Sequence, residues 1–137
     1  MKNWKLRLIG AVLLTFCFTA TFAQTQSEMN REACDDYKKA DAELNKVYQQ
    51  VLREYKADAL FVQKMKNAQR AWVTYRDAYL ESLYPSGTPQ SAYGSVYPMC
   101  RCSVLADLTK RRVEELRRWV DGVEEGDVCS GSVKIRT

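Results

Sequence analysis

Four cysteines, Cys34, Cys100, Cys102 and Cys129, are the residues best able to do chemistry in the chain that follows its first 23 residues. An even number of cysteines in a small exported domain indicates disulfide bonds first. A metal site is disfavoured, because the Cys100–Cys102 pair has no second close pair and the sequence contains no histidine. Four cysteines allow three pairings, and the sequence does not choose among them. We expect disulfides, no metal and no cofactor.

The sequence offers few residues that could act as catalytic groups. Without histidine there is no His-based acid–base chemistry and no Ser-His or Cys-His nucleophile. The carboxylate pairs are Asp35–Asp36 and Glu114–Glu115, and adjacent residues of a helix point to different sides. Such pairs do not flank a glycosidic bond as a glycosidase requires. We therefore expect no catalytic residues and a protein that is not an enzyme.

The N-terminus has the three parts of a secretory signal. A basic start precedes a short apolar run at 8–18, and small residues follow at Thr21 and Ala23. The run is too short for a stable membrane span. We expect a cleavable signal peptide at 1–23, export to the periplasm or the exterior, and no stable membrane anchor.

The net charge depends mostly on that signal. Three of the 21 Lys and Arg residues lie in it, which leaves 18 against 17 Asp and Glu and a net charge of +1. A nearly neutral domain gives no general affinity for nucleic acid or an anionic membrane. We expect neither as a partner.

Two helices follow the signal. The first is expected from a cap at Ser27 or Asn30 to about residue 56, with a stripe at steps of three and four: Cys34, Tyr37, Asp41, Leu44, Tyr48, Val51 and Tyr55. The second is expected from a cap at Asp58 to about residue 84, with the stripe Phe61, Met65, Ala68, Trp72, Tyr75, Tyr79 and Leu83. No Gly or Pro marks the break, so one continuous helix is the alternative. A turn is favoured because two antiparallel helices bury their stripes against each other.

A turn centred near residue 58 predicts a register in which Leu44 faces Trp72, Tyr48 faces Ala68 and Val51 faces Met65. Asp41 then comes opposite Tyr75 and Arg76, and a buried carboxylate needs such a donor. We expect a bidentate Asp41–Arg76 tie, whose loss would cost about 3–5 kcal/mol if it is buried. Trp72 is expected to be the central packing residue, with a similar cost of about 3–5 kcal/mol for Trp72→Ala.

The segment from Pro85 to Pro98 is rich in Ser, Gly, Pro and Tyr and has no helical or strand period. Loops of this length are usually functional or disordered, and tyrosines beside small residues are typical of binding loops. A mobile connector is the alternative. The candidate partner-binding residues are Ser86, Tyr93, Ser95, Tyr97 and Arg101.

A third helix is expected from about Met99 to Val123, with the inward stripe Leu105, Leu108, Arg112, Leu116, Trp119 and Val123. The predicted fold is all-α, a three-helix up-down-up antiparallel bundle in which a helical hairpin is joined by a third helix. The domain spans 24–123 and a tail spans 124–137. In this bundle Cys34 lies near Cys100 and Cys102 and bonds one of them, and the other bonds Cys129 if the tail folds back.

Several motifs of the chain resemble the LprI-like lysozyme-inhibitor family of small exported bacterial proteins. They are a cysteine before Tyr37-Lys38-Lys39-Ala40-Asp41, then Ala68-Gln69-Arg70-Ala71-Trp72 with Tyr75-Arg76-Asp77, and a later cysteine before Leu108-Thr109. The resemblance covers about residues 28–118 and implies an all-helical, disulfide-tied domain, in some members linked to inhibition of lysozyme. Members often carry a cysteine where this chain has Leu80, so the family's disulfide pairing does not transfer.

The resemblance and the residues together predict an exported binding protein. We expect it to inhibit lysozyme-type muramidases by protein–protein contact, since a rigid, disulfide-tied surface lowers the entropic cost of association. The alternative is a non-catalytic structural or assembly module of the cell envelope whose partner is unknown. The oligomeric state is not indicated by the sequence.

Overall fold

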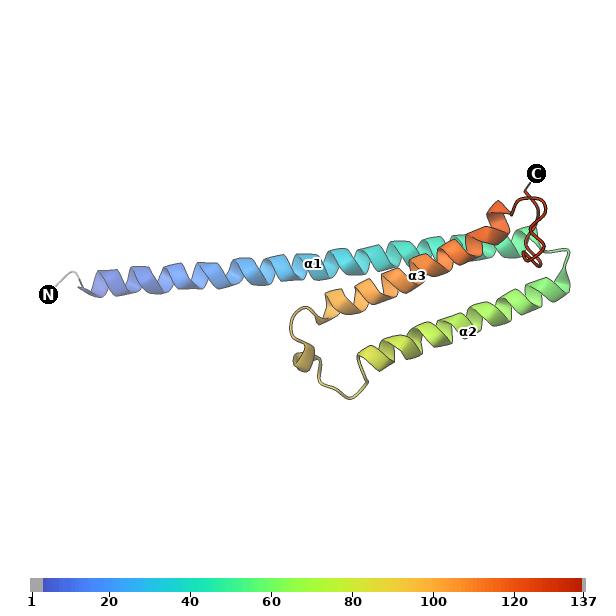
Figure 1. The fold of residues 1–137 in the computed structure, drawn as a ribbon. Coiled ribbons are helices and arrows are strands. Elements are labelled where there is room, and N and C mark those ends of the chain that lie inside the picture. The colour runs from blue at the N-terminus through green and yellow to red at the C-terminus, as the bar shows by residue number, and fades with distance from the viewer. Residues whose placement is uncertain (1–3, 137) are drawn as a thin grey trace.

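The computed structural model describes the backbone of residues 4–136 and the side chains of residues 25–136. Three α-helices make up most of this part of the chain: α1 (Trp4–Glu54), α2 (Ala59–Leu83) and α3 (Tyr97–Asp121) (Figure 1). A short 3-10 helix, η1 (Gln90–Tyr93), lies in the connection between α2 and α3. The described residues contain no strand, only an isolated bridge between Val123 and Ile135. The all-α prediction is confirmed.

The start of α1 differs from the prediction. The helix begins at Trp4 rather than near residue 30, and the expected caps Ser27 and Asn30 lie inside it. No Gly or Pro between residues 11 and 54 interrupts the helical backbone. The expected signal peptide at 1–23 lies outside the residues whose side chains are described. Among those that are, no helix is both long enough and apolar enough to cross a membrane.

The predicted turn between the first two helices is confirmed at residues 55–58. Asp58 caps α2, because its Oδ1 accepts a hydrogen bond of 2.8 Å from the backbone N–H of Phe61. The ring of Tyr55 stacks on that of Phe61 at a centroid distance of 4.3 Å. One continuous helix is therefore excluded.

Helices α1 and α3 lie side by side along most of α3 and run in the same direction (Figure 1). The disulfide Cys34–Cys102 joins them near one end, and near the other the Tyr55 hydroxyl donates to the Trp119 carbonyl at 3.2 Å. The side chains buried at this contact are mostly small, and small side chains let two helix axes approach closely. They are Ala40, Val47, Ala106, Thr109 and Val113.

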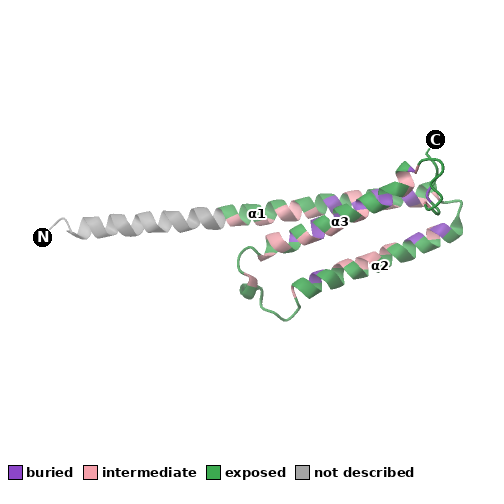
Figure 2. Ribbon diagram, viewed as in Figure 1, coloured by how far each residue is buried: buried purple, intermediate pink, exposed green. Residues whose placement is uncertain are grey.

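Helix α2 lies apart from this pair and approaches either backbone at few points (Figures 1 and 2). Only Phe61, Met65 and Leu80 of α2 are buried. Tyr75, Tyr79 and Leu83 are exposed, so the expectation that α1 and α2 bury their whole stripes against each other is wrong. The physical reason is competition, because α3 with its smaller side chains occupies the apolar face of α1 more closely.

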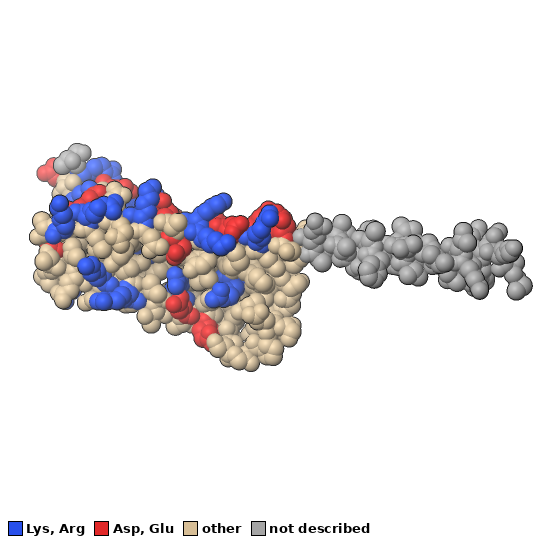
Figure 3. All heavy atoms as spheres, turned by 180° about the vertical axis from the view of Figure 1, so that it is seen from behind, with Lys and Arg blue, Asp and Glu red and all other residues tan. Residues whose placement is uncertain are grey.

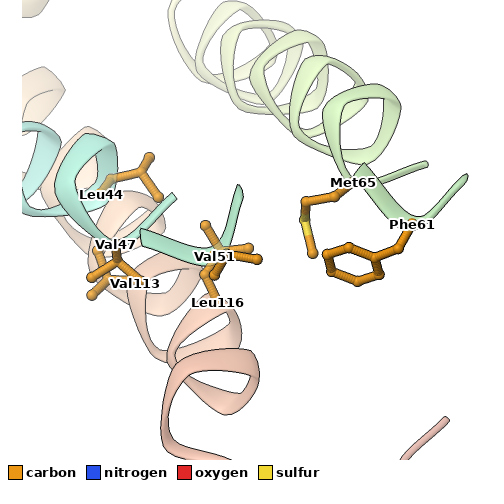
Figure 4. Close-up of a cluster of buried hydrophobic side chains, with 7 residues drawn as sticks. All are labelled: Leu44, Val47, Val51, Phe61, Met65, Val113 and Leu116. Atoms are coloured by element: carbon orange, nitrogen blue, oxygen red, sulfur yellow. The ribbon is translucent and has the colours of Figure 1, made fainter. Parts of the chain in front are cut away.

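A cluster of buried hydrophobic side chains lies mostly between α1 and α3. Figure 4 shows side chains of α1 meeting those of α3, while Phe61 and Met65 approach from α2; the seven are Leu44, Val47, Val51, Phe61, Met65, Val113 and Leu116. Leu116 and Val51 are fully buried. The expected stripe of α1 thus contacts two different helices. Leu44 and Val51 are in the core. Tyr37, Asp41 and Tyr48 are half-buried on the side that meets arginines of α2.

The tail after α3 folds over the end of the molecule opposite the disulfide (Figure 1). The Tyr55 hydroxyl accepts from the Lys134 backbone N–H at 2.9 Å, and the Lys134 ammonium pairs with Glu54 at 2.7 Å. The tail begins at Gly122, whose φ of +75° favours glycine. A Cβ there would also lie 3.0 Å from the Lys134 carbonyl oxygen, so the tail packs here only against a glycine.

This position of the tail overturns the predicted Cys100–Cys129 bond. Cys100 lies in the first turn of α3 and Cys129 beyond its last, so the length of the helix, about 35 Å, separates them. Both are free thiols, Cys100 half-buried and Cys129 exposed.

Candidate partner-binding site

A cleft of about 410 Å³ opens at the disulfide end, between the last turns of α2, the connecting loop and the start of α3. Four of the five residues predicted to bind a partner line it: Ser86, Tyr93, Tyr97 and Arg101. The α2 side is formed by Asp77, Leu80, Glu81 and Tyr84. The fold therefore gathers residues that are up to 24 positions apart in the sequence, from Asp77 to Arg101, around one concave surface.

The disulfide fixes the α3 wall of this cleft to α1. Cys34 and Cys102 are joined with a Cα–Cα distance of 4.9 Å, and the Cys34 sulfur lies 3.7 Å from the Pro98 carbonyl oxygen. Pro98 and Cys102 are four residues apart and share one face of α3, whereas Cys100 points away from it. The predicted bond from Cys34 to this pair is confirmed, and helical geometry decides that Cys102 is the partner.

Three tyrosines pack against one another beside the cleft. The rings of Tyr93 and Tyr97 stack at a centroid distance of 5.3 Å, and Tyr84 meets their edges at 5.4 and 5.3 Å. Burial, and next the neighbouring Cys100 thiol, raises the pKa of Tyr84. The loop thus carries a small aromatic core, which orders Tyr93 and Tyr97 before any partner arrives. Tyr84, the residue directly after α2, was not among the predicted site residues.

Glu81 anchors the start of the loop. Its carboxylate accepts hydrogen bonds from the backbone N–H of Ser86 and, at 2.8 Å, from the Ser86 hydroxyl. The backbone N–H, followed by the hydroxyl, lowers the pKa of Glu81 because both stabilise the charged form. No pattern in the sequence indicates this residue, since an acid five positions before a serine is not a recognised motif.

Ser95 lies apart from the other predicted residues. It does not line the cleft, and its backbone carbonyl accepts a hydrogen bond of 2.9 Å from the Asn30 side chain. Together with the disulfide at the start of α3, this hydrogen bond holds the loop against α1.

Arg101 is the cationic group of the cleft. Its side chain is exposed and makes no hydrogen bond or ion pair with any residue that the structure describes. Asp77 and Glu81 line the α2 side of the same cleft. Because an unpaired guanidinium offers planar donors to a carboxylate or carbonyl, Arg101 is free to bind an incoming group.

The cleft carboxylates are not arranged as an acid and a base. Asp77 pairs with Arg76 at 2.8 Å, and both oxygens of Glu81 bind Ser86. A general acid needs a raised pKa, whereas that of Glu81 is lowered. Among the described residues there is also no group of three or more His, Cys, Asp or Glu side chains able to hold a metal. The surface is suited to binding.

Arg76 does reach Asp41, at 3.9 Å, but the pair is neither bidentate nor buried. The Asp41 side chain is 42% exposed, and Arg76 lies closer to Asp77, at 2.8 Å, and to the Tyr37 hydroxyl, at 3.5 Å. The expected cost of several kcal/mol for losing one partner is therefore too large. The predicted contact between the two residues is present, with a carboxylate that remains accessible to water.

Trp72 and Tyr75 also differ from their expected roles. Trp72 is half-buried beside the core, and its ring lies near the guanidinium groups of Arg76 (5.5 Å) and Arg112 (6.0 Å). Trp72 therefore makes one cation–π contact within α2 and one with α3, and it is not the central packing residue. Tyr75 is 54% exposed and does not pack in the core.

Two cations on the outer face of α3 are paired with acids of α1. Lys110 pairs with Asp36 of α1 at 2.6 Å, and Arg117 pairs with Glu43 of α1. Figure 3 shows Lys and Arg side chains alternating with Asp and Glu along one edge of this face. These cations connect α3 to α1 rather than forming a surface of one sign.

Comparison with known proteins identifies the class. A family model described as "Lysozyme inhibitor LprI" matches residues 17–116, most of the chain, so the chain belongs to the LprI lysozyme-inhibitor family. The resemblance found in the motifs is thereby confirmed. A relative in Rhizobium meliloti (strain 1021), itself an uncharacterized protein, is 36% identical over 113 residues, covering 74% of this chain and 78% of the relative. No solved structure gives a significant match.

Proposed function

We propose that this protein is an exported binding protein that inhibits lysozyme-type muramidases by protein–protein contact through the cleft and its loop. The main support for this proposal is that four predicted binding residues line one cleft in a chain of a family described as lysozyme inhibitors; they are Ser86, Tyr93, Tyr97 and Arg101. Inhibition by this particular chain, its export and its target are parts of the proposal.

The rigidity of the site supports this proposal. The loop is tied to α2 by Glu81, to α1 by Asn30 and to itself by the stacked tyrosines. A surface held in place before binding loses less conformational entropy on association. In this proposal residues 1–23 are a signal peptide, and an up-down-up bundle of the three helices holds the loop at the disulfide end.

The chemistry of the site suits a protein or sugar-cleft surface. Tyrosine supplies large contact area at low entropic cost, and Ser86 and Arg101 supply directional hydrogen bonds. Charge alone does not drive the contact, because Arg101 and the carboxylates of α2 balance each other across the cleft. The proposal therefore rests on shape and aromatic contact, with weak dependence on salt.

The test is titration of the purified protein into lysozymes of several structural types, with lysis of bacterial cell walls as the activity. We expect at least one type to be inhibited, and the double variant Tyr93→Ala/Tyr97→Ala to weaken inhibition at least about tenfold. Arg101→Glu should weaken it as well, whereas Arg118→Glu, an exposed change on the same helix outside the cleft, should not.

Two results would count against the proposal. Full activity of every lysozyme type at high concentrations of the protein would refute inhibition. Inhibition that persists in the tyrosine and Arg101 variants would move the contact elsewhere on the molecule. Co-purification with an envelope protein, insensitive to these variants, would instead favour the structural or assembly module.

A further inference from the structure

A second hollow, of about 240 Å³, lies between α2 and α3 and shares no lining residue with the end cleft; its lining residues are Tyr75, Tyr79, Val104, Asp107, Leu108 and Arg111. The two tyrosines are 54% and 40% exposed, and their ring centroids are 6.0 Å apart. Adjacent exposed aromatic and aliphatic side chains usually mark an interaction surface. We call this hollow the α2–α3 groove.

The groove contains a carboxylate and a guanidinium that form no salt bridge with any described residue; the charged group near the carboxylate of Asp107 is Lys110. Asp107 and Arg111 are one turn apart on α3, the spacing at which opposite charges usually pair on a helix. Neither forms an ion pair or hydrogen bond through its side chain with any residue in the described part of the chain. The neighbouring Lys110 is already paired with Asp36. The groove thus offers one positive and one negative group to a partner.

We propose that the α2–α3 groove is the interface of a two-fold homodimer in which α3 of one copy lies antiparallel to α3 of the other. In a two-fold interface each contact occurs twice, because the same surface is used by both copies. With the axis level with the midpoint between them, Asp107 faces the partner's Arg111 and Arg111 faces the partner's Asp107. The charges of the groove are therefore complementary to themselves.

The apolar part of the groove is complementary to a second copy as well. Each groove offers two aromatic rings from α2 and two aliphatic side chains, Val104 and Leu108, from α3. With α3 facing α3, the α2 helices of the two copies also face each other, so the exposed tyrosines of one copy meet those of the other, and the aliphatic side chains line the contact between the two α3 helices. Interface cores are enriched in aromatic residues and hold complementary charges at their edges. A partner of one charge sign would leave either Asp107 or Arg111 facing a like charge.

The test is a charge swap read by sedimentation equilibrium of the exported protein. All forms carry Cys129→Ser, because this exposed thiol could link copies covalently. We expect the parent protein to be dimeric at about 50 µM, and Asp107→Arg or Arg111→Asp alone to raise the dimer dissociation constant at least about 30-fold, since each places two like-charged pairs in the interface. The double swap Asp107→Arg/Arg111→Asp should restore the dimer.

Each other result overturns the proposal. A parent protein that is monomeric at about 1 mM has no such dimer. A dimer unaffected by the single reversals uses another face, and a double swap that stays monomeric breaks the predicted pairing. Chemical modification of Tyr79 gives a further check. If Tyr79 is protected only when another envelope protein is added, the groove is the binding site of that protein and not a dimer interface. Because Asp107 and Arg111 are exposed, thermal melting should show equal folding in all forms.

Discussion

Helix α1 has two neighbours, and they are packed in opposite ways. Against α3 the buried side chains are mostly small, the backbones lie close and a disulfide joins the two helices. Against α2 the contacts are made by long side chains, such as Tyr37 with Arg76, and the backbones stay apart. Small residues allow close approach and full burial, whereas large ones span a wider gap and remain partly in solvent. The end cleft and the α2–α3 groove both lie along α2.

The largest effect should come from the covalent part of the α1–α3 contact. Cys34→Ser/Cys102→Ser should lower the free energy of unfolding by about 4 kcal/mol, because the bond spans 68 positions of the chain and restricts the unfolded state. Urea denaturation measures the change. Cys100→Ser is the matched control, and an equal loss from it would contradict the Cys34–Cys102 assignment.

Truncation on the two sides should show the difference in packing directly. Leu116→Ala, in the fully buried contact, should cost about 3 kcal/mol, and Trp72→Ala about 2 kcal/mol despite its larger side chain, because Trp72 is only half-buried. The exposed Leu60→Ala, with a cost of at most about 0.5 kcal/mol, is the control for both. A greater loss for Trp72→Ala than for Leu116→Ala would reverse the comparison.

One substitution in the contact between α1 and α3 should raise the stability of the protein. Thr109 is fully buried, and its hydroxyl has no hydrogen-bond partner among the described residues. An unsatisfied buried hydroxyl costs about 1–3 kcal/mol, so Thr109→Val should stabilise the protein by about 1 kcal/mol. Thermal unfolding measures the rise, and Thr109→Ser, which keeps the hydroxyl and removes a methyl, should destabilise. A loss of stability in Thr109→Val would mean that the hydroxyl has a partner in solution.

The smallest effect should come from the surface ion pair of α2. Asp41→Asn should change the free energy of unfolding by less than about 1 kcal/mol, because the pair is 3.9 Å long and its carboxylate is accessible to water. Denaturation at low and high salt checks both the size and the screening. A loss near the 3–5 kcal/mol expected of a buried pair would show that α2 closes more tightly on α1 than in this structure.

Local patterns predicted a good part of this architecture. The stripes of Leu44, Val51 and Leu116 mark buried faces, Asp58 marks a helix start, and the loop composition marked three residues of the end cleft, Ser86, Tyr93 and Tyr97. These features depend on neighbours within one helix or loop, so the sequence carries them. The small residues Ala40, Ala106 and Thr109 were passed over, since a search for large apolar side chains misses the contact where helices approach most closely.

The sequence by itself determined that this is an all-α chain, where its helices break, that Cys34 bonds the Cys100–Cys102 pair, and to which family the chain belongs. Only the tertiary structure decided which helix lies closest to α1, which cysteine of the pair is used and where the tail lies. Periodicity fixes which face of a helix is apolar. The choice between two partners for that face depends on side-chain size at every facing position at once, a property that no single segment contains.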